Sequence, residues 1–359
     1  MKKIILLLII IIPFKINALS SYVVMDKESA RVLEGSNIND TRLIASITKI
    51  MTAIIAIENS NLEDIVKVDK DVLKAFGSAI YIEVGEEISL KDLLYGLMLR
   101  SGNDAAIEIA NHVSNSMEDF VKLMNNKAQE LNMKDTVFIN DSGLENDKGE
   151  GNISSAYDMA LLMRYAMNNA TFREIVKTKK YTCKSSYKTY VWNNKNRLLN
   201  EYKYTIGGKT GFTQKARRTL VTVANKDNKE IIIVTLNDPN DFSNHKKLYE
   251  KNFKKYNLVT IVNKNYFSFN KIKYNGKLYI NDSFKMLLTK EEEKNISIDY
   301  QMNPNNNYSN EDEVGKMIIK LDNKEITSIP IYIKVNEIKK ESIFKRIINF
   351  LKFWERDNG

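Results

Sequence analysis

The order of helical and extended segments constrains the fold of this chain more than any other feature. After a pair of short strands expected in 21–37, apolar residues recur at helical spacing in 46–59, 90–113, 117–131 and 155–169. Runs rich in β-branched residues follow at 219–225 and 229–237, on either side of Asp227 and Asn228. Helices first and paired strands later, without repeating strand–helix–strand units, predict an α+β fold in which helices pack on an antiparallel sheet.

The pattern changes near residue 256, where short alternating runs replace the helical segments. From 257 to 335 these runs are separated by turns rich in Asn, and 301–313 have the composition of a polar loop. A chain of 359 residues suits one large domain and one small domain. We therefore expect a large domain over 19–256 and a small β-domain over 257–335.

The first residues have the form of a signal peptide. Lys2 and Lys3 precede an unbroken apolar run from Ile4 to Ile12, and Ala18 is a small residue before the expected cleavage site. The run is shorter than the roughly 20 residues that span a bilayer, which favours a cleaved signal peptide (1–18) over an uncleaved anchor. Either form predicts export to the outer face of the cytoplasmic membrane or to the cell wall.

The last residues, 336–359, have the pattern of an amphipathic helix. A helix of this kind is typical of the membrane interface, and the alternative is a helix that packs on its own domain. The net charge of +9 fits an anionic membrane or wall polymer, whereas export and the lack of a basic–aromatic motif argue against nucleic acid. The apolar face, opposite a basic one, consists of Ile343, Phe344, Ile347, Ile348, Phe350, Leu351 and Trp354.

Three short motifs carry candidate chemistry: Ser46-Ile47-Thr48-Lys49, Ser101-Gly102-Asn103 and Lys209-Thr210-Gly211. Each is weak evidence alone, because short motifs recur by chance. Their order and context are informative, since the first opens a helical segment, the second separates two helices and the third leads into a strand.

This combination suits a serine nucleophile with a lysine base. Lys49 lies one helical turn from Ser46, and it can accept a proton if burial or a nearby charge, such as that of Lys209, lowers its pKa. Ser101 can relay a proton to the leaving amine, while Asn103 can hold Lys49 and the substrate amide. Backbone N–H groups at Ser46 and beside the Lys209 strand can form an oxyanion hole.

Composition disfavours other kinds of site. The single cysteine, Cys183, lies in a polar stretch without a base and is expected to be a buried thiol. The two histidines, His112 and His245, lie in no catalytic context, and Ser46 lacks the elbow motif of Ser-His-Asp hydrolases. These counts predict no metal site and no cofactor.

From about Ser20 to Leu258 the chain resembles the low-molecular-weight penicillin-binding proteins of the D-alanyl-D-alanine carboxypeptidase type. The stretches 42–53, 93–106, 155–166 and 206–216 look like signatures of that family. The resemblance implies a β-lactamase/transpeptidase-like domain, a small C-terminal β-domain and a terminal amphipathic helix. It also implies removal of the terminal D-alanine from peptidoglycan stem peptides, and binding of β-lactam antibiotics.

The resemblance further assigns roles to the motif residues. Ser46 would be the acylated nucleophile and Lys49 the proton acceptor. The second motif would be Ser101 and Asn103, and the backbone of Ser46 and Phe212 would hold the oxyanion. Substrate binding would fall to Lys209, Thr210, Gly211 and Phe212.

Two positions depart from the family pattern. Arg217 stands where relatives usually have a glycine, and an arginine is strained there if the backbone takes a positive φ. Asp241 stands where many relatives have an arginine that meets the terminal carboxylate of the substrate. Arg217, Arg218 and Thr210 are therefore candidates to bind that carboxylate, and a solvated surface role for Arg217 is the alternative.

Two other functions share parts of this pattern. A β-lactamase needs a carboxylate for deacylation, and neither Glu145 nor Glu150 is convincingly placed in the sequence for that role. A wall-binding protein without turnover would explain the two departures but not the intact motifs. The sequence favours the carboxypeptidase and leaves endopeptidase and transpeptidase activity open.

Overall fold

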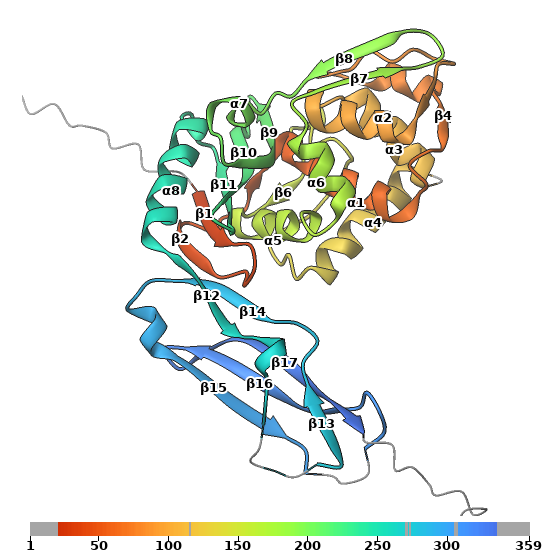
Figure 1. Ribbon diagram of the computed structural model, residues 1–359. Coiled ribbons are helices and arrows are strands. Elements are labelled where there is room, and N and C mark those ends of the chain that lie inside the picture. The colour runs from red at the N-terminus through yellow and green to blue at the C-terminus, as the bar shows by residue number, and fades with distance from the viewer. Residues whose placement is uncertain (1–20, 115, 270–271, 273, 305–307, 336–359) are drawn as a thin grey trace, which may run out of the picture. The chain divides into compact units, whose positions relative to one another are not determined.

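The computed structural model describes residues 21–114, 116–269, 272, 274–304 and 308–335 (Figure 1). The chain divides into two compact units between Asn257 and Leu258. The predicted signal peptide (1–18) and C-terminal helix (336–359) lie outside the described residues, so both stay predictions. Within the described ranges, no helix combines the length and apolar character needed to cross a bilayer.

An antiparallel sheet of five strands forms the centre of the first unit. The strand order is β2-β1-β11-β10-β9, which confirms the predicted α+β class with an antiparallel sheet. The β10–β11 hairpin turns at Asp227 and Asn228, whose positive φ angles are those of a type I′ turn. The strands are β1 (Ser21–Asp26), β2 (Val32–Ser36), β9 (Thr205–Thr213), β10 (Arg217–Lys226) and β11 (Lys229–Leu236).

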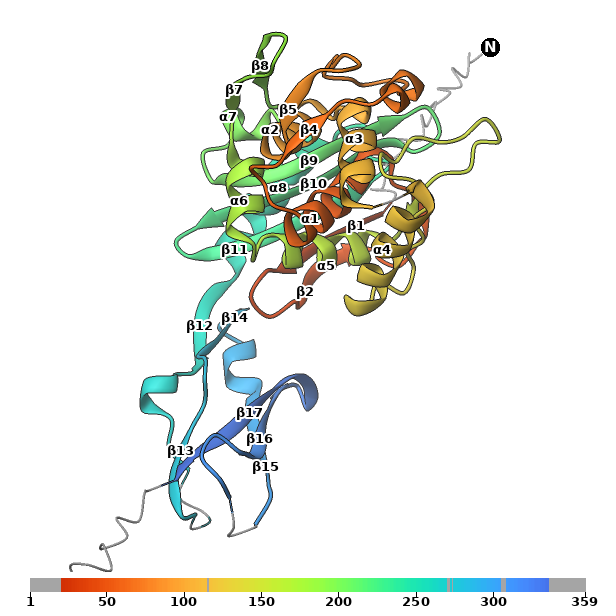
Figure 2. The same ribbon diagram turned by 90° about the vertical axis from the view of Figure 1, so that its right-hand side faces the viewer.

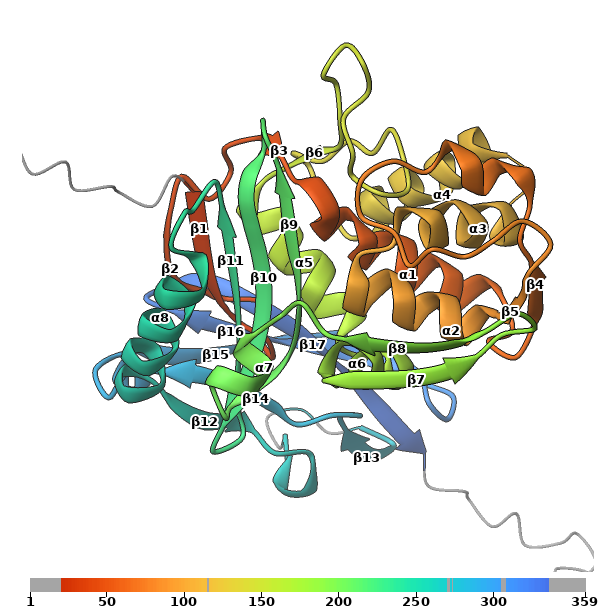
Figure 3. The same cartoon turned by 90° about the horizontal axis from the view of Figure 1, so that it is seen from above.

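Helices cover both faces of this sheet (Figure 3). On one face, α8 (Asp241–Lys255) packs against β10 and β11; the sequence analysis did not predict this helix. On the other face, α5 (Ala156–Ala166) packs against β1 and β11, and α6 (Ala170–Lys177) packs against β9. The remaining helices of this layer, in front of the sheet in Figure 2, are α1 (Lys49–Asn59), α2 (Leu90–Tyr95), α3 (Asn103–Val113) and α4 (Met117–Glu130).

Polar side chains fix the starts of several of these helices. Ser89, Ser116, Ser155 and Asn169 each accept a hydrogen bond from the backbone N–H three residues later. Each cap satisfies one of the backbone donors that have no partner in the first helical turn. These caps lie at the starts of α2, α4, α5 and α6, whereas α1 and α3 begin without a side-chain cap.

The sequence analysis missed a hairpin formed by β7 (Lys180–Lys184) and β8 (Thr189–Asn193). Its buried face is aromatic: Tyr181 stacks on Tyr95 of α2, and Trp192 is 4% exposed. Cys183 is buried on the same hairpin, and burial raises its pKa to about 12, which suits an unreactive thiol.

Shorter elements connect these parts of the first unit. They are β3 (Arg42–Leu43) paired with β6 (Ile153–Ser154), β4 (Ile65–Lys67) paired with β5 (Glu87–Ser89), the helical turns η1 (Ala45–Thr48), η2 (Lys70–Lys74) and η3 (Gly96–Arg100), and α7 (Leu198–Glu201).

The second unit is built from strands. A four-stranded antiparallel sheet has the order β13-β17-β16-β15, and a separate pair joins β12 and β14. Its apolar core includes Val314, Met317, Ile319, Ile331 and Ile333. The strands are β12 (Asn257–Val262), β13 (Gly276–Tyr279), β14 (Phe284–Leu288), β15 (Ile296–Met302), β16 (Glu313–Leu321) and β17 (Lys324–Val335), with η4 (Lys264–Tyr266) and η5 (Glu292–Asn295) between them.

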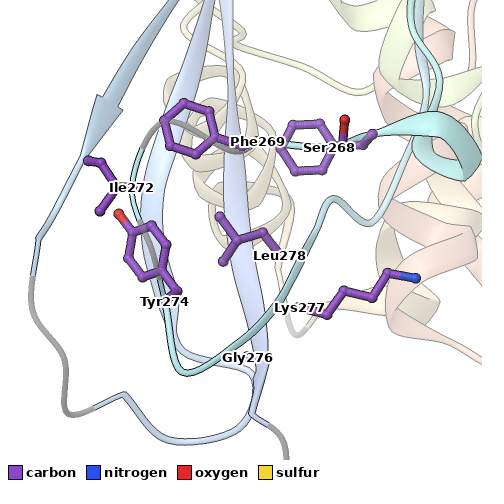
Figure 4. Close-up of a pocket in the computed structure, with 8 residues that line it drawn as sticks. Ser268, Phe269, Ile272, Tyr274, Gly276, Lys277 and Leu278 are labelled. Carbon is purple, nitrogen blue, oxygen red and sulfur yellow. The ribbon is translucent and has the colours of Figure 1, made fainter.

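A cavity of about 580 Å³ lies in this second unit (Figure 4). Phe269, Ile272, Tyr274 and Leu278 line it with apolar and aromatic groups, whereas the Lys277 side chain extends away from them. The polar side chains of the described lining are those of Ser268, Tyr274 and Lys277. This part of the lining is therefore mainly apolar and aromatic.

Candidate active site

Ser46 lies in the 3-10 turn η1, immediately before α1. The turn places Lys49, the first residue of α1, with its Nζ 3.4 Å from Ser46 Oγ. η1 packs against β9 at the edge of the sheet (Figure 3). The structure therefore brings the predicted serine and lysine together, although Ser46 precedes the α-helix rather than opening it.

The Lys49 side chain is completely buried. Its Nζ donates hydrogen bonds to Asn103 Oδ1 and to Ser142 O, both at 2.7 Å. Burial lowers the pKa of Lys49 to about 7; the charge of Asp141 opposes this effect, and that of Lys195 adds to it. An amine with this pKa is partly neutral near pH 7, so it can accept a proton from a hydroxyl group.

Ser101 and Asn103 lie at the break between two helical segments. The π-helical turn η3 ends at Ser101, whose φ of 65° puts its backbone in the left-handed region. α3 then begins at Asn103, whose Oδ1 faces Lys49 while Nδ2 donates to Phe76 O. Such turns and strained residues are common at functional sites, and this one directs Ser101 toward Lys209.

Lys209 projects from β9 and is buried. Its Nζ donates to Ser101 Oγ at 3.0 Å and to Thr210 O at 2.8 Å. Burial and the charges of Lys49 and Lys195 lower the pKa of Lys209 well below its usual value. Lys195 is the neighbouring cation that lowers the pKa of Lys49, and the charges of Lys49 and Lys195 oppose protonation of Lys209 in addition to its burial.

Two glycines allow backbone segments to approach Ser46 closely. A Cβ on Gly211 would lie 2.4 Å from Thr219 Oγ1 and 3.0 Å from Ser46 N. Gly143 has a φ of 83°, and a Cβ there would lie 1.9 Å from Ala45 O. The first contact holds β9 against η1, and the second brings the segment that carries the Ser142 carbonyl against the same turn.

Two cavities open beside Ser46. The first, of about 360 Å³, we name the Arg218 cavity, and the second, of about 460 Å³, the Arg100 cavity. Both cavities are lined by Ser46, Ser78, Lys195 and Phe212. The Arg218 cavity is also lined by Ser101, Thr210, Gly211, Arg218 and Phe242. The Arg100 cavity is also lined by Gly77, Ala79, Tyr81, Arg100, Asn103, Gly143, Leu144 and Thr213. Because both meet at the nucleophile, the two halves of a peptide can lie on either side of its reacting bond.

Arg217 and Arg218 differ in their surroundings. Arg217 is exposed, lines neither cavity and has a φ of 61°, so the strain expected at this position is present. Arg218 lines the Arg218 cavity, and its Nε and Nη2 donate to Asp241 at 3.1 and 2.9 Å. This bidentate ion pair leaves Nη1 of Arg218 available to bind a ligand.

Two charged residues that influence Lys49, Asp141 and Lys195, were not predicted from the sequence. Asp141 is 3% exposed, and its Oδ2 has no hydrogen-bond partner among the described residues. Burial raises the pKa of Asp141 to about 6, so the carboxyl group is mostly ionised at pH 7. Lys195 lines both cavities and donates to Ser78 Oγ at 3.1 Å. The sequence carries no signal for either, because both reach the site from segments outside the three motifs.

The other residues weighed in the sequence lie elsewhere. Glu145 and Glu150 line neither cavity beside Ser46. His112 is hydrogen-bonded to Asp64, and His245 is buried between two threonines. In the part of the chain that the structure describes, no three His, Cys, Asp or Glu side chains gather as metal ligands would.

Comparison with known proteins decides the family. Residues 12–240 match the family model described as D-alanyl-D-alanine carboxypeptidase, which is more than half of the chain. The chain belongs to this family. Residues 244–339 also match the model of the C-terminal domain of penicillin-binding protein 5. The predicted resemblance to low-molecular-weight penicillin-binding proteins, with a C-terminal β-domain, is therefore confirmed.

Three relatives illustrate the similarity. D-alanyl-D-alanine carboxypeptidase DacF of Bacillus subtilis is 36% identical over 220 residues, which cover 60% of this chain and 56% of DacF, little more than half of its length. The crystal structure of DacD from Francisella tularensis has a TM-score of 0.67 at 26% identity and covers 94% of this chain and 96% of its own. A mutant of the Streptomyces K15 DD-transpeptidase has a TM-score of 0.61 at 32% identity, with 65% and 97% covered.

The left-handed backbone of Arg217 predicts that Arg217→Gly stabilises the protein by about 0.5–1 kcal/mol. A left-handed backbone costs an L-residue roughly 1–2 kcal/mol of folding free energy. Glycine avoids this cost, but it loses more conformational entropy on folding, which reduces the net gain in stability. Urea unfolding of the two proteins measures the difference. Arg217→Ala is the control, since it removes the side chain but keeps the strain. A gain as large for alanine as for glycine would contradict a backbone origin.

The electrostatic surroundings of Lys49 predict how the rate of Ser46 acylation depends on pH. A lysine base must be neutral, so the rate of acylation by penicillin should rise with pH through a limb near pH 7. Lys195→Met removes a charge that lowers the pKa of Lys49 and should move the limb to higher pH. Asp141→Asn removes a charge that raises this pKa and should move the limb to lower pH.

Lys180→Met, at an exposed position on β7, is the control for these pH profiles and should leave the limb in place. Shifts of the same sign in the Lys195 and Asp141 variants would show that these charges do not act on Lys49.

Proposed function

We propose that the chain is a serine D-Ala-D-Ala carboxypeptidase that removes the terminal D-alanine from peptidoglycan stem pentapeptides. The observation that carries the proposal is the buried Lys49 amine, whose pKa is about 7 and whose Nζ lies 3.4 Å from Ser46 Oγ. Membership of the D-alanyl-D-alanine carboxypeptidase family supports the choice of substrate.

Acylation follows from the arrangement around Ser46. Neutral Lys49 takes the Ser46 hydroxyl proton as Oγ attacks the carbonyl carbon of the penultimate D-alanine. The backbone N–H groups of Ser46 and Phe212 stabilise the resulting oxyanion. The C–N bond then breaks, and the leaving amine takes a proton that Ser101 relays from Lys49. The products are an ester on Ser46 and free D-alanine.

Water completes the cycle. It attacks the ester carbonyl and gives a proton to Lys49, after which the bond to Oγ breaks and Ser46 regains its proton. The same acylation by a β-lactam opens the lactam ring and leaves an ester on Ser46, so penicillin is an inhibitor. An amine in place of water would give transpeptidation, and the similarity to the Streptomyces DD-transpeptidase structure makes this the second candidate activity.

The Arg218 cavity suits the terminal carboxylate of the substrate. Thr210 and Arg218 line it, and the buried Lys209 amine donates a hydrogen bond to Ser101, which also lines it. A bound carboxylate would offset the cost of protonating buried Lys209. Of the two arginines considered from the sequence, the geometry favours Arg218, because Arg217 does not line the cavity.

We also propose where the protein acts and how its parts divide the work. The domain over 19–256 carries catalysis, the β-domain over 257–335 follows it, and 336–359 attach the protein to an anionic membrane surface. The signal peptide over 1–18 would deliver it to the outer face of the cytoplasmic membrane, where the substrate is found. The basic and apolar faces of 336–359 and the apolar run after Lys3 support this part of the proposal.

Acylation by penicillin tests the nucleophile and the base. Intact-mass measurement should show one adduct per chain, and peptide mapping should place it on Ser46. Ser46→Ala should form no adduct, and Lys49→Ala should acylate on the order of 100-fold more slowly or worse, as expected when a general base is lost. An adduct in Ser46→Ala, or a wild-type rate in Lys49→Ala, would refute the mechanism.

Matched substrates test the carboxylate site. Arg218→Ala should lower kcat/KM about ten- to a hundredfold for a D-Ala-D-Ala peptide with a free terminal carboxylate, because a charge-assisted hydrogen bond is lost. The same peptide with a terminal amide should lose little. Arg217→Ala is the control and should spare both substrates. Equal losses on acid and amide would instead assign Arg218 a structural role.

Truncation before Lys340 tests the membrane helix. The truncated protein should stay folded and hydrolyse soluble peptides at the normal rate, but should no longer sediment with anionic vesicles. Binding of the full-length chain should weaken with salt without vanishing, because apolar burial and charge act together. If truncation destabilises the protein, or if the full-length chain never binds vesicles, the helix packs on its own domain.

A further inference from the structure

Two cations, Arg100 and Lys195, line the Arg100 cavity. Arg100 is the last residue of η3, and Lys195 follows β8, so two separate segments bring them to the same cavity. Both donate hydrogen bonds to neutral oxygen atoms: Arg100 Nη1 donates to Asn193 O at 3.2 Å and Lys195 Nζ to Ser78 Oγ at 3.1 Å. Neither cation forms an ion pair with a carboxylate of the described residues.

In the protein without a bound ligand, the positive charges of Arg100 and Lys195 repel each other. Partial burial lowers the pKa of Lys195, and the neighbouring charge of Arg100 lowers it further. Asp104, in the first turn of α3, is buried and accepts hydrogen bonds from the backbone N–H groups of Ile80 and Tyr81. An anion that enters the cavity from outside would relieve the repulsion.

The position of the cavity indicates which part of a substrate brings that anion. The Arg218 cavity takes the leaving D-alanine in the proposed function, so the Arg100 cavity lies on the acyl side of the reacting bond. Asn103, the residue proposed to hold the substrate amide, and Thr213 at the end of β9 line this second cavity. The acyl part of the peptide therefore passes beside Arg100 and Lys195.

We infer that Arg100 and Lys195 bind a free carboxylate carried by the acyl-donor part of the stem peptide, and so select acidic stem peptides over neutral ones. This inference rests on the proposed carboxypeptidase function. The carboxylate can belong to either of the two residues that precede D-Ala-D-Ala, and both sources share the same chemistry. Arg100 offers a planar pair of donors and Lys195 a point charge, a combination suited to a carboxylate at the edge of a cleft.

Isosteric substrates test the inference on the full-length protein. Two pairs of tetrapeptides ending in D-Ala-D-Ala carry glutamate or glutamine, one pair at the residue before D-Ala-D-Ala and one pair at the residue before that. Release of D-alanine gives the ratio of kcat/KM for each acid to that for its amide. We expect a ratio of about ten for at least one pair, falling as salt is added, because both cations are partly exposed to water. The responding pair identifies the position of the carboxylate.

Variants separate a specific site from a general charge effect. Arg100→Gln and Lys195→Gln should each bring the ratio close to one. Because Lys195 also influences Lys49, only the ratio at one pH is compared, and any change in the shared catalytic step cancels. Lys180→Gln, which removes one exposed positive charge from β7, should keep the wild-type ratio.

The outcomes distinguish this inference from the proposed function. If the amide peptides are hydrolysed but the wild-type ratio is close to one, or if Arg100→Gln and Lys195→Gln keep it, the inference is overturned and the carboxypeptidase stands. If no peptide is hydrolysed and penicillin forms no adduct on Ser46, the proposed function is overturned, and the inference with it. A ratio lost equally in Lys180→Gln would show that overall charge, not this cavity, selects the substrate.

Discussion

The burial of two lysine amines, Lys49 and Lys209, in one seam between η1, β9 and the helix break is the constraint on which the first unit depends. Removing a charged amine from water costs several kcal/mol unless hydrogen bonds replace the lost hydration. Asn103 Oδ1 and Ser142 O receive the donors of Lys49, and Ser101 Oγ and Thr210 O receive those of Lys209. These four oxygen atoms come from the helix break, a loop and the edge strand β9, so the seam exists only when all three segments meet at η1.

The local backbone features follow from that requirement. The left-handed residue at Ser101 turns a hydroxyl toward Lys209, and the close approach at Gly143 brings a carbonyl to Lys49. Gly211 lets β9 lie against the backbone of Ser46, where the proposed oxyanion hole would form. Strain at these points is tolerated because it places the oxygen atoms that accept hydrogen bonds from the two buried amines.

The charge balance around Lys49 depends on residues that no motif contains. Asp141 favours the protonated amine, and burial and Lys195 favour the neutral one, so the pKa reflects a difference between opposing effects. A change at either residue alters the base without touching the nucleophile. This arrangement also connects substrate binding with catalysis, because Lys195 lines both cavities beside Ser46.

The sequence predicted the parts of this site that depend on local pattern. Helical periodicity gave the segments that carry Ser46, Lys49 and Asn103, and β-branched runs gave the strands beside Lys209. The carbonyl of Ser142 could not be foreseen, because every residue has a carbonyl and only the fold selects one. Asp141 and Lys195 were missed because their influence acts through space rather than through sequence spacing. The β7–β8 hairpin was missed because its buried aromatic residues alternate with polar ones over only five residues per strand.

The two departures from the family pattern have different physical consequences. At Arg217 the backbone has the positive φ that a glycine adopts without strain. The conformation is therefore kept, and only its free-energy cost is higher than for a glycine. At Asp241 the sign of the charge is reversed where relatives are expected to have an arginine, yet Arg218 on β10 reaches the cavity and pairs with Asp241. The pair restores a guanidinium at the cavity but cancels much of its charge. Lys209 must then contribute more of the attraction for a carboxylate, and it can do so only when that carboxylate makes protonation of its buried amine favourable. In the proposed function, binding of the substrate carboxylate and protonation of Lys209 are therefore coupled.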